Sequence, residues 1–277
     1  MEARAKRGAM ATKESGFQLT GAGPAGYERY MIPAHCDARA EDLLRRVNPQ
    51  PQEHLLDIAC GTGIVTRRAA PLVGDLGRVV GTELNPQMLQ VARELSAYQD
   101  SVEFIEGDAE ALPVPDGSFD IALCQQAFMF FPNQVVAAQE IHRALKPGGR
   151  TAISVFRTLQ HNPAFEHLVR ALEKHAGTEA AAFMRSPFIF ENPEQIRAPF
   201  IKAGFKKVTV IVRVAPLRYP SIRHMVRYET LNVSDPSLHT GEMQTMLCNE
   251  MESAAAEYTD DHGVVFPSQD FVVHTTK

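Results

Sequence analysis

The stretch LLDIACGTGIV, residues 55–65, decides how the rest of this chain folds. Its apolar first half predicts a short buried strand over residues 55–59, and Gly61 and Gly63 predict a sharp turn that a ligand can approach closely. The helix that follows offers unpaired N–H groups and the positive end of its dipole. Glu83 ends the next apolar run about 20 residues later, where a carboxylate can bind both hydroxyls of a ribose. The stretch therefore indicates a nucleoside-bearing cofactor at the carboxyl ends of parallel strands.

The length and composition of the chain limit its fold and its partners. Its 277 residues fit one large α/β domain, and 44% hydrophobic and 22% charged residues are ordinary for a globular protein. The net charge of −5 argues against a nucleic-acid partner, because phosphate binding favours a basic surface. We expect no membrane span, because no run approaches the roughly 20 apolar residues that a membrane helix needs. The charged start of the chain is not followed by the apolar segment of a secretion signal.

The cysteines indicate the compartment. Cys36, Cys60, Cys124 and Cys248 are far apart in the chain and show no metal-binding spacing. We therefore expect free thiols, no disulfide framework and no metal site, which fits a cytoplasmic protein.

Strand and helix patterns alternate over the first half of the chain. Strands are predicted at residues 55–59, 78–83, 101–106, 119–124 and 150–156, with helices at 62–73, 86–96 and 133–145. This alternation predicts a parallel sheet covered by helices on both faces. After Arg157 the pattern changes to helices at 163–175, 193–203, 222–231 and 240–258, with strands at 205–214 and 271–275.

These patterns predict one continuous domain in three parts. Residues 1–25 are expected to form a flexible tail, and residues 26–156 the cofactor-binding core with N-terminal helices. Residues 157–277 complete the sheet and add helical caps at 157–191 and 215–262. Tyr27 and Tyr30 are three residues apart and would share one face of a helix. That helix either packs on the core or forms a lid across the cofactor pocket.

Five ordered motifs carry a resemblance to a known family. The run from Asp57 to Gly63 resembles the Asp-x-x-x-Gly-x-Gly loop of class I S-adenosylmethionine-dependent methyltransferases. Four further stretches resemble the next four signatures of that family in order and spacing. They are Glu83, residues 107–109, residues 119–120 and residues 145–149. The resemblance covers residues 27–156 and the final strands, and it is strongest to the quinone-biosynthesis-like and bacterial secondary-metabolite branch. It implies a Rossmann-like, doubly wound α/β fold, with a seven-stranded mostly parallel sheet, one antiparallel C-terminal strand and a helical cap.

The resemblance also implies the cofactor and the residues around it. S-adenosylmethionine is the expected methyl donor and S-adenosylhomocysteine its product. By resemblance, Asp57 lies near the methionine ammonium, Glu83 binds the ribose hydroxyls and Asp108 binds the adenine amino group. Asp57 can instead be a structural carboxylate that fixes the turn, and Asp108 a turn cap. The expected cofactor-binding residues are Tyr30, Asp57, Ala59, Gly61, Thr62, Gly63, Glu83, Leu84, Met88, Gly107, Asp108, Ala109 and Gln125.

The acceptor side of the site carries weaker signals. The loop QQAFMFF, residues 125–131, follows the fourth strand, where methyl donor and acceptor meet in the family. We expect Tyr27, Gln126 and Phe128 to contact a small apolar or aromatic acceptor, although the phenylalanines of this loop can instead pack into the core. His161 is a candidate base and Arg157 a candidate for orienting an anionic acceptor. His224 and His239 are further candidate bases, and each histidine also fits a purely structural role.

The sequence therefore predicts transfer of a methyl group to an oxygen or carbon atom of a small molecule. A quinone-biosynthesis C-methyltransferase is the alternative within the family. A nicotinamide-dependent oxidoreductase and a non-catalytic S-adenosylmethionine-binding protein are alternatives from other classes. Thr66 stands where a dinucleotide site has its third glycine, which argues against the oxidoreductase. Because the family often pairs through its cap or sheet edge, a homodimer remains open.

Overall fold

The computed structural model describes residues 23–231 and 235–277 of the chain. The flexible tail expected at residues 1–25 lies outside the described residues, apart from its last three. Those three belong to a short helix, α1 (Gly23–Gly26). No helix within the described ranges is both long and apolar enough to cross a membrane.

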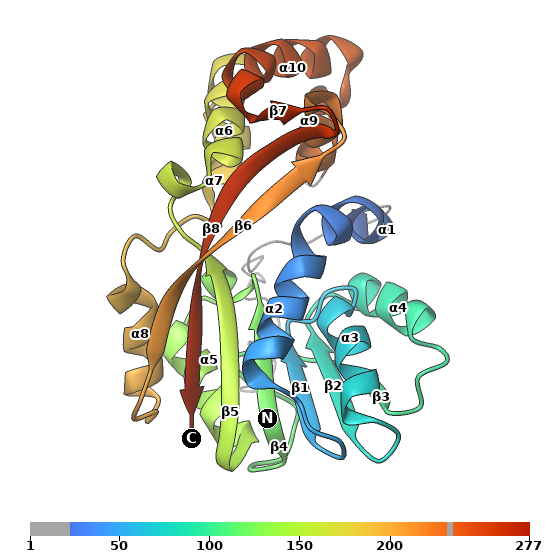
Figure 1. The fold of residues 1–277 in the computed structure, drawn as a ribbon, viewed down its shortest axis with the longest axis vertical. Coiled ribbons are helices and arrows are strands. Elements are labelled where there is room, and N and C mark those ends of the chain that lie inside the picture. Colours follow the sequence, from blue (N-terminus) through green and yellow to red (C-terminus); the bar gives the residue numbers. More distant parts are fainter. Residues whose placement is uncertain (1–22, 232–234) are drawn as a thin grey trace, which may run out of the picture.

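One sheet runs through the molecule (Figure 1). Its main path has the strand order β3-β2-β1-β4-β5-β8-β6, and β7 pairs with β8 beside it. Neighbours from β3 to β5 are parallel, whereas β8 lies antiparallel between β5 and β6. The predicted seven-stranded, mostly parallel sheet with an antiparallel C-terminal strand is confirmed, and the eighth strand, β7, has only two residues. The strands are β1 (His54–Ile58), β2 (Arg78–Glu83), β3 (Val102–Glu106), β4 (Phe119–Gln125), β5 (Leu145–Phe156), β6 (Thr209–Tyr219), β7 (Thr259–Asp260) and β8 (Gly263–Thr276).

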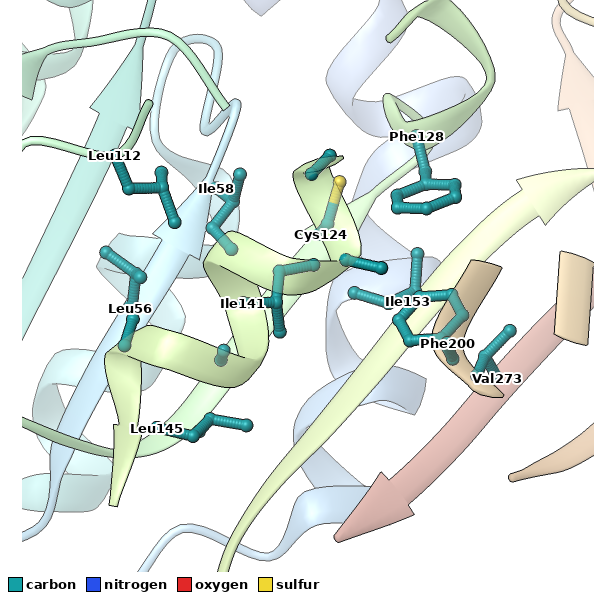
Figure 2. Packing of buried hydrophobic residues seen from close by; sticks show 14 of the residues in the cluster. Leu56, Ile58, Leu112, Cys124, Phe128, Ile141, Leu145, Ile153, Phe200 and Val273 are labelled. Atoms are coloured by element: carbon teal, nitrogen blue, oxygen red, sulfur yellow. The ribbon is translucent and has the colours of Figure 1, made fainter. Parts of the chain in front are cut away.

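Helices cover both faces of the parallel part of the sheet. On one face, Leu43 of α2 and Val65 of α3 belong to a buried apolar cluster that also contains residues of the sheet. On the other face Ile141 and Phe200 pack from α5 and α8 over Ile153 (Figure 2). These helices, with α4 beside β2 and β3, are α2 (Asp37–Val47), α3 (Ile64–Val73), α4 (Pro86–Leu95), α5 (Gln134–Ala144) and α8 (Pro193–Lys202).

A helical cap surrounds the far ends of β6 and β8, above the sheet in Figure 1. Its apolar cluster includes Leu168, Leu217, Met225 and Phe266 and is separate from the two clusters of the core. The cap elements are η3 (Leu159–His161), α6 (Pro163–His175), α7 (Thr178–Arg185), α9 (Ile222–Thr230), η4 (Pro236–His239), α10 (Gly241–Ala255) and η5 (Ala256–Tyr258).

Strands β6 and β8 reach further than the sequence predicts. β6 ends at Tyr219 rather than at residue 214, and β8 begins at Gly263 rather than at residue 271. Pro216 and Pro267 interrupt the two apolar runs, which is why the pattern predicts shorter strands. In the structure these prolines face each other in register, and the ladder continues past them into the cap.

The N-terminal segment joins core and cap. Residues Tyr27–Cys36 form a π-helix, η1, which packs against β6, α9 and α2. In the next helix, Arg39 is 2% exposed, and its Nε donates to Asp270 Oδ2 of β8 at 2.8 Å. A second donor of the same guanidinium, Nη2, reaches Ser268 Oγ at 2.9 Å. This buried pair holds η1 and α2 against the strand that runs from core to cap.

Candidate active site

A cavity lies at the carboxyl ends of the parallel strands, where open α/β sheets bind their ligands. Loops after β1, β2, β3 and β4 form its wall, and η1 contributes one side chain. The residues that line this first cavity are Tyr27, Ala59, Gly61, Glu83, Leu84, Asn85, Met88, Gly107, Asp108, Ala109, Gln125, Gln126, Ala127, Phe130, Phe131 and Pro132.

The glycine loop between β1 and α3 needs its glycines. Gly61 has φ 58° and Gly63 has φ 85°, in the left-handed region that favours glycine. A Cβ atom on Gly63 would come within 3.0 Å of the Phe104 ring. The loop can therefore approach a ligand with its backbone while α3 stays packed against the sheet.

Asp57 fixes this loop from beneath. Its side chain is 1% exposed, and Oδ2 accepts hydrogen bonds from Thr66 N at 3.0 Å and Thr66 Oγ1 at 2.7 Å. Burial raises the pKa of Asp57 to about 7. Asp57, Thr62 and Gly63 do not line the cavity, and these contacts are those of a carboxyl group that fixes the turn.

Glu83 ends β2 and lines the cavity. Oε2 accepts a hydrogen bond from Gly61 N at 3.1 Å, and Oε1 accepts one from Asn85 N at 2.9 Å. Burial raises the pKa of Glu83, although these backbone donors favour the ionised form. The carboxylate is thus held in one orientation, and its remaining lone pairs are available to a ligand.

Gln125 is the last residue of β4 and Gln126 follows it, and both line the cavity. Gln125 Nε2 donates to the carbonyl of Cys36 at 3.1 Å, which ties η1 to the strand end. Gln126 has φ 53°, and neither its Oε1 nor its Nε2 has a hydrogen-bond partner among the described residues. Ala59, which lines the same cavity, has φ 54°. Strained backbone and unpaired buried amides are concentrated where ligands bind.

A second cavity adjoins the first and shares Tyr27, Gln126 and Phe130 with it. Most of its other side chains are aromatic or apolar, and its polar members are His35, Cys36 and Glu229. The apolar members are Met31, Phe156, Phe165, Phe183, Met184, Pro187 and Phe188. They come from η1, the end of β5 and the helices of the cap.

Several residues singled out in the sequence lie outside both cavities. Tyr30 stacks on Tyr228 with ring centroids 4.1 Å apart, and Phe128 is fully buried in the core with its ring 5.2 Å from that of Phe200. Phe128 therefore packs inward, which was the alternative interpretation of its loop, while Phe130 and Phe131 line the first cavity.

The two candidate catalytic residues also point elsewhere. His161 contacts the neighbouring Gln160, and the Arg157 guanidinium donates to Gln269 and lies over the Phe271 ring. Neither residue lines the first or the second cavity. His224 contacts Ser221 at 2.8 Å and is likewise outside both.

Of the residues that line the second cavity, the sequence predicts only Tyr27 and Gln126 as substrate-binding. His35 and Glu229 are 194 positions apart in the chain, and no motif links them. The available signal is the density of phenylalanine over residues 183–190, which has no helical or alternating period. Only the fold shows that these rings, η1 and α9 meet.

Comparisons with known proteins agree with this geometry. Residues 56–153 match the family model described as a methyltransferase domain. A demethylmenaquinone methyltransferase of Staphylococcus aureus (strain JH9) is 32% identical over 167 residues, which cover 56% of this chain and 68% of that protein.

Solved structures show the same fold. YcgJ from Bacillus subtilis has a TM-score of 0.61 at 18% identity, over 87% of this chain and 98% of that one. Phosphoethanolamine N-methyltransferase 2 of Haemonchus contortus, in complex with phosphomonomethylethanolamine and S-adenosylhomocysteine, has a TM-score of 0.61 at 20% identity, over 92% of this chain and 57% of that one. With the sequence match above, these findings show that the chain belongs to the class I S-adenosylmethionine-dependent methyltransferases.

Proposed function

We propose that the chain transfers a methyl group from S-adenosylmethionine in the first cavity to an oxygen or carbon atom of a small, largely apolar or aromatic molecule in the second. The observation that carries this proposal is the shared wall of the two cavities, formed by Tyr27, Gln126 and Phe130. Methyl transfer from a sulfonium is an in-line displacement, which requires donor and acceptor to be held on either side of one point. Two adjoining cavities provide such an arrangement.

The charge of the first cavity fits this donor. Its lining contains the carboxyl groups of Glu83 and Asp108 and no lysine or arginine among the described residues. S-adenosylmethionine carries a sulfonium and no phosphate, so carboxylates favour its binding. The pyrophosphate of a nicotinamide dinucleotide would be repelled by the same groups, and this disfavours the oxidoreductase alternative.

The proposed contacts follow the placement of the lining residues. Glu83 would bind the ribose hydroxyls, and Leu84, Met88 and Ala109 would enclose the adenine ring. Asp108 is exposed at the cavity edge, and its Oδ1 accepts a hydrogen bond from Glu110 N at 2.8 Å, which leaves Oδ2 for the adenine amino group. Gln125 would border the methionine portion, next to the wall shared with the second cavity.

The lining of the second cavity supports an aromatic acceptor. Phe156, Phe165 and Phe188 pack against one another there, with ring centroids 4.9–5.7 Å apart. Such rings bind a flat apolar molecule and exclude water from the reaction. A quinone-biosynthesis C-methyltransferase is the second candidate, favoured by the similarity to the demethylmenaquinone methyltransferase of S. aureus.

The test is product formation with deuterated methyl donor. S-adenosylmethionine labelled as CD₃ is incubated with the protein and a panel of naphthols, reduced naphthoquinones and aliphatic alcohols, and the products are analysed by mass spectrometry. We expect labelled product with aromatic acceptors only. Donor binding without product from any acceptor would instead support the non-catalytic S-adenosylmethionine-binding alternative.

A further inference from the structure

A cluster of buried titratable side chains lies at the second cavity. His35 is 5% exposed and Glu229 is 3% exposed, and both line this otherwise apolar space. Tyr219 is fully buried behind them. The three residues come from η1, α9 and β6, so the cluster exists only because the N-terminal segment packs against the cap. Burying such groups is costly unless they are paired.

The hydrogen bonds within the cluster assign its protons. Tyr219 Oη donates to Glu229 Oε1 at 2.7 Å, which uses the single proton of the phenol. His35 Nε2 lies 2.7 Å from the same carboxylate oxygen and 2.6 Å from Tyr219 Oη. Because both neighbouring oxygens then act as acceptors toward the imidazole, Nε2 must carry the hydrogen.

This assignment leaves the other ring nitrogen as the base. Neutral imidazole with hydrogen on Nε2 has its lone pair on Nδ1, and Nδ1 has no hydrogen-bond partner among the described residues. A carboxylate that fixes the tautomer and stabilises the imidazolium is the arrangement that activates hydroxyl nucleophiles in acyl transfer. Glu229 is placed for the same task, and Tyr219 orients Glu229.

We propose that His35 takes the proton of an aromatic hydroxyl group on the acceptor, so that the chain forms an aryl methyl ether. The hydroxyl oxygen forms the new bond to the methyl carbon with its lone pair. The C–S bond breaks, its electron pair goes to sulfur, and the sulfonium becomes the neutral thioether S-adenosylhomocysteine. The hydroxyl proton passes to Nδ1 of His35 and then to solvent. This inference rests on the proposed function and narrows its acceptor to a hydroxyarene.

The position of His35 agrees with this role. The next residue, Cys36, accepts a hydrogen bond from Gln125 through its carbonyl and contacts Tyr27 Oη through Sγ at 3.3 Å. Gln125 and Tyr27 both line the first cavity. His35 therefore lies one residue along η1 from the boundary between donor and acceptor cavities.

The experiment compares two acceptors of different acidity. Methyl transfer to 2-naphthol and to the more acidic 6-cyano-2-naphthol is measured for the wild type, His35→Gln, Glu229→Gln and Tyr219→Phe. A matched control is His175→Gln, because His175 also pairs with a glutamate, Glu250, but lies outside both cavities. S-adenosylhomocysteine affinity and thermal unfolding are measured for every variant.

We expect His35→Gln to lower kcat for 2-naphthol by about 100-fold or more, as for loss of a general base. The loss should be less than about tenfold with 6-cyano-2-naphthol, which ionises readily without help. Glu229→Gln should show the same pattern, Tyr219→Phe a weaker one, and His175→Gln none. S-adenosylhomocysteine should bind all variants equally.

Three results would overturn the proposal. The first is an equal loss for both naphthols in His35→Gln, which indicates a structural role. The second is unchanged activity in that variant. The third is the absence of naphthol methylation by wild-type protein that still binds S-adenosylhomocysteine. Failure to bind S-adenosylhomocysteine would instead contradict the proposed function itself.

Discussion

At the scale of single residues, Gln126 combines a strained backbone with a side-chain amide that has no hydrogen-bond partner among the described residues. Its backbone is left-handed, its amide is buried without a partner among the described residues, and it belongs to both cavities. A buried amide without partners destabilises the folded state. We propose that a bound ligand supplies the missing hydrogen-bond partner, because Gln126 lines both cavities.

Replacing Gln126 should therefore raise stability and reduce activity. We expect Gln126→Ala to increase the free energy of unfolding by about 1 kcal/mol, because the unpaired amide is removed. The same change should lower kcat/KM for the acceptor about tenfold or more, which corresponds to a lost hydrogen bond of about 1.4 kcal/mol. Urea unfolding and steady-state kinetics measure the two effects. Gln126→Gly, which also relieves the positive φ, should lose activity equally, and wild-type activity in this variant would show that activity does not need the Gln126 amide.

Asp57 should make stability depend on pH. Burial raises its pKa from 3.8 to about 7, so the folded protein keeps a proton that the unfolded chain releases across this interval. Stability should then fall as pH rises from about 4 to about 7, by on the order of 2–4 kcal/mol from this group. Asp57→Asn should remove this part of the slope. Urea unfolding of the ligand-free protein at several pH values tests this, and identical slopes in both proteins would contradict it.

At the scale of elements, η1 shows that residue spacing alone does not predict which way two side chains point. Tyr27 and Tyr30 were expected to share a helical face, yet Tyr27 enters both cavities while Tyr30 stacks on Tyr228. The reason is the π-helix, whose wider turn separates side chains that an α-helix would align. The glycine loop, by contrast, is predictable from the sequence, because its turn needs residues with positive φ and Gly61 and Gly63 provide them.

The anchoring of this element can be tested through Arg39. Arg39→Met should lower the free energy of unfolding by about 2–3 kcal/mol, because it removes buried hydrogen bonds to Asp270, although Arg213 Nη1 still reaches Asp270 Oδ2 at 3.1 Å. The matched control is Arg68→Met, which removes an ion pair with Asp37 in which both side chains are 40% exposed. That change should cost less than about 1 kcal/mol. Equal losses in urea unfolding would show that the buried pair does not hold α2 to β8.

At the scale of the whole molecule, the core was more predictable than the cap. Strand–helix alternation and five motifs predict the sheet and the first cavity, because most residues that line this cavity lie on loops that directly follow successive strands. The second cavity assembles side chains from η1, α6, α7 and α9, and the ladder that supports it passes through Pro216 and Pro267. Such long-range assembly has no local sequence period. We propose that the parallel core binds the donor and that the cap selects the acceptor.

We propose above that the first cavity binds the methyl donor through Glu83. The direct test is calorimetric titration of S-adenosylhomocysteine into the wild type, Glu83→Gln and Glu106→Gln. Glu106 pairs in register with Glu83 at the end of β3 but is exposed and does not line the cavity. We predict one site in the wild type, unchanged affinity in Glu106→Gln, and affinity reduced about tenfold or more in Glu83→Gln, equivalent to about 1.4 kcal/mol. No binding to the wild type, or equal affinity in all three proteins, would contradict this role of Glu83.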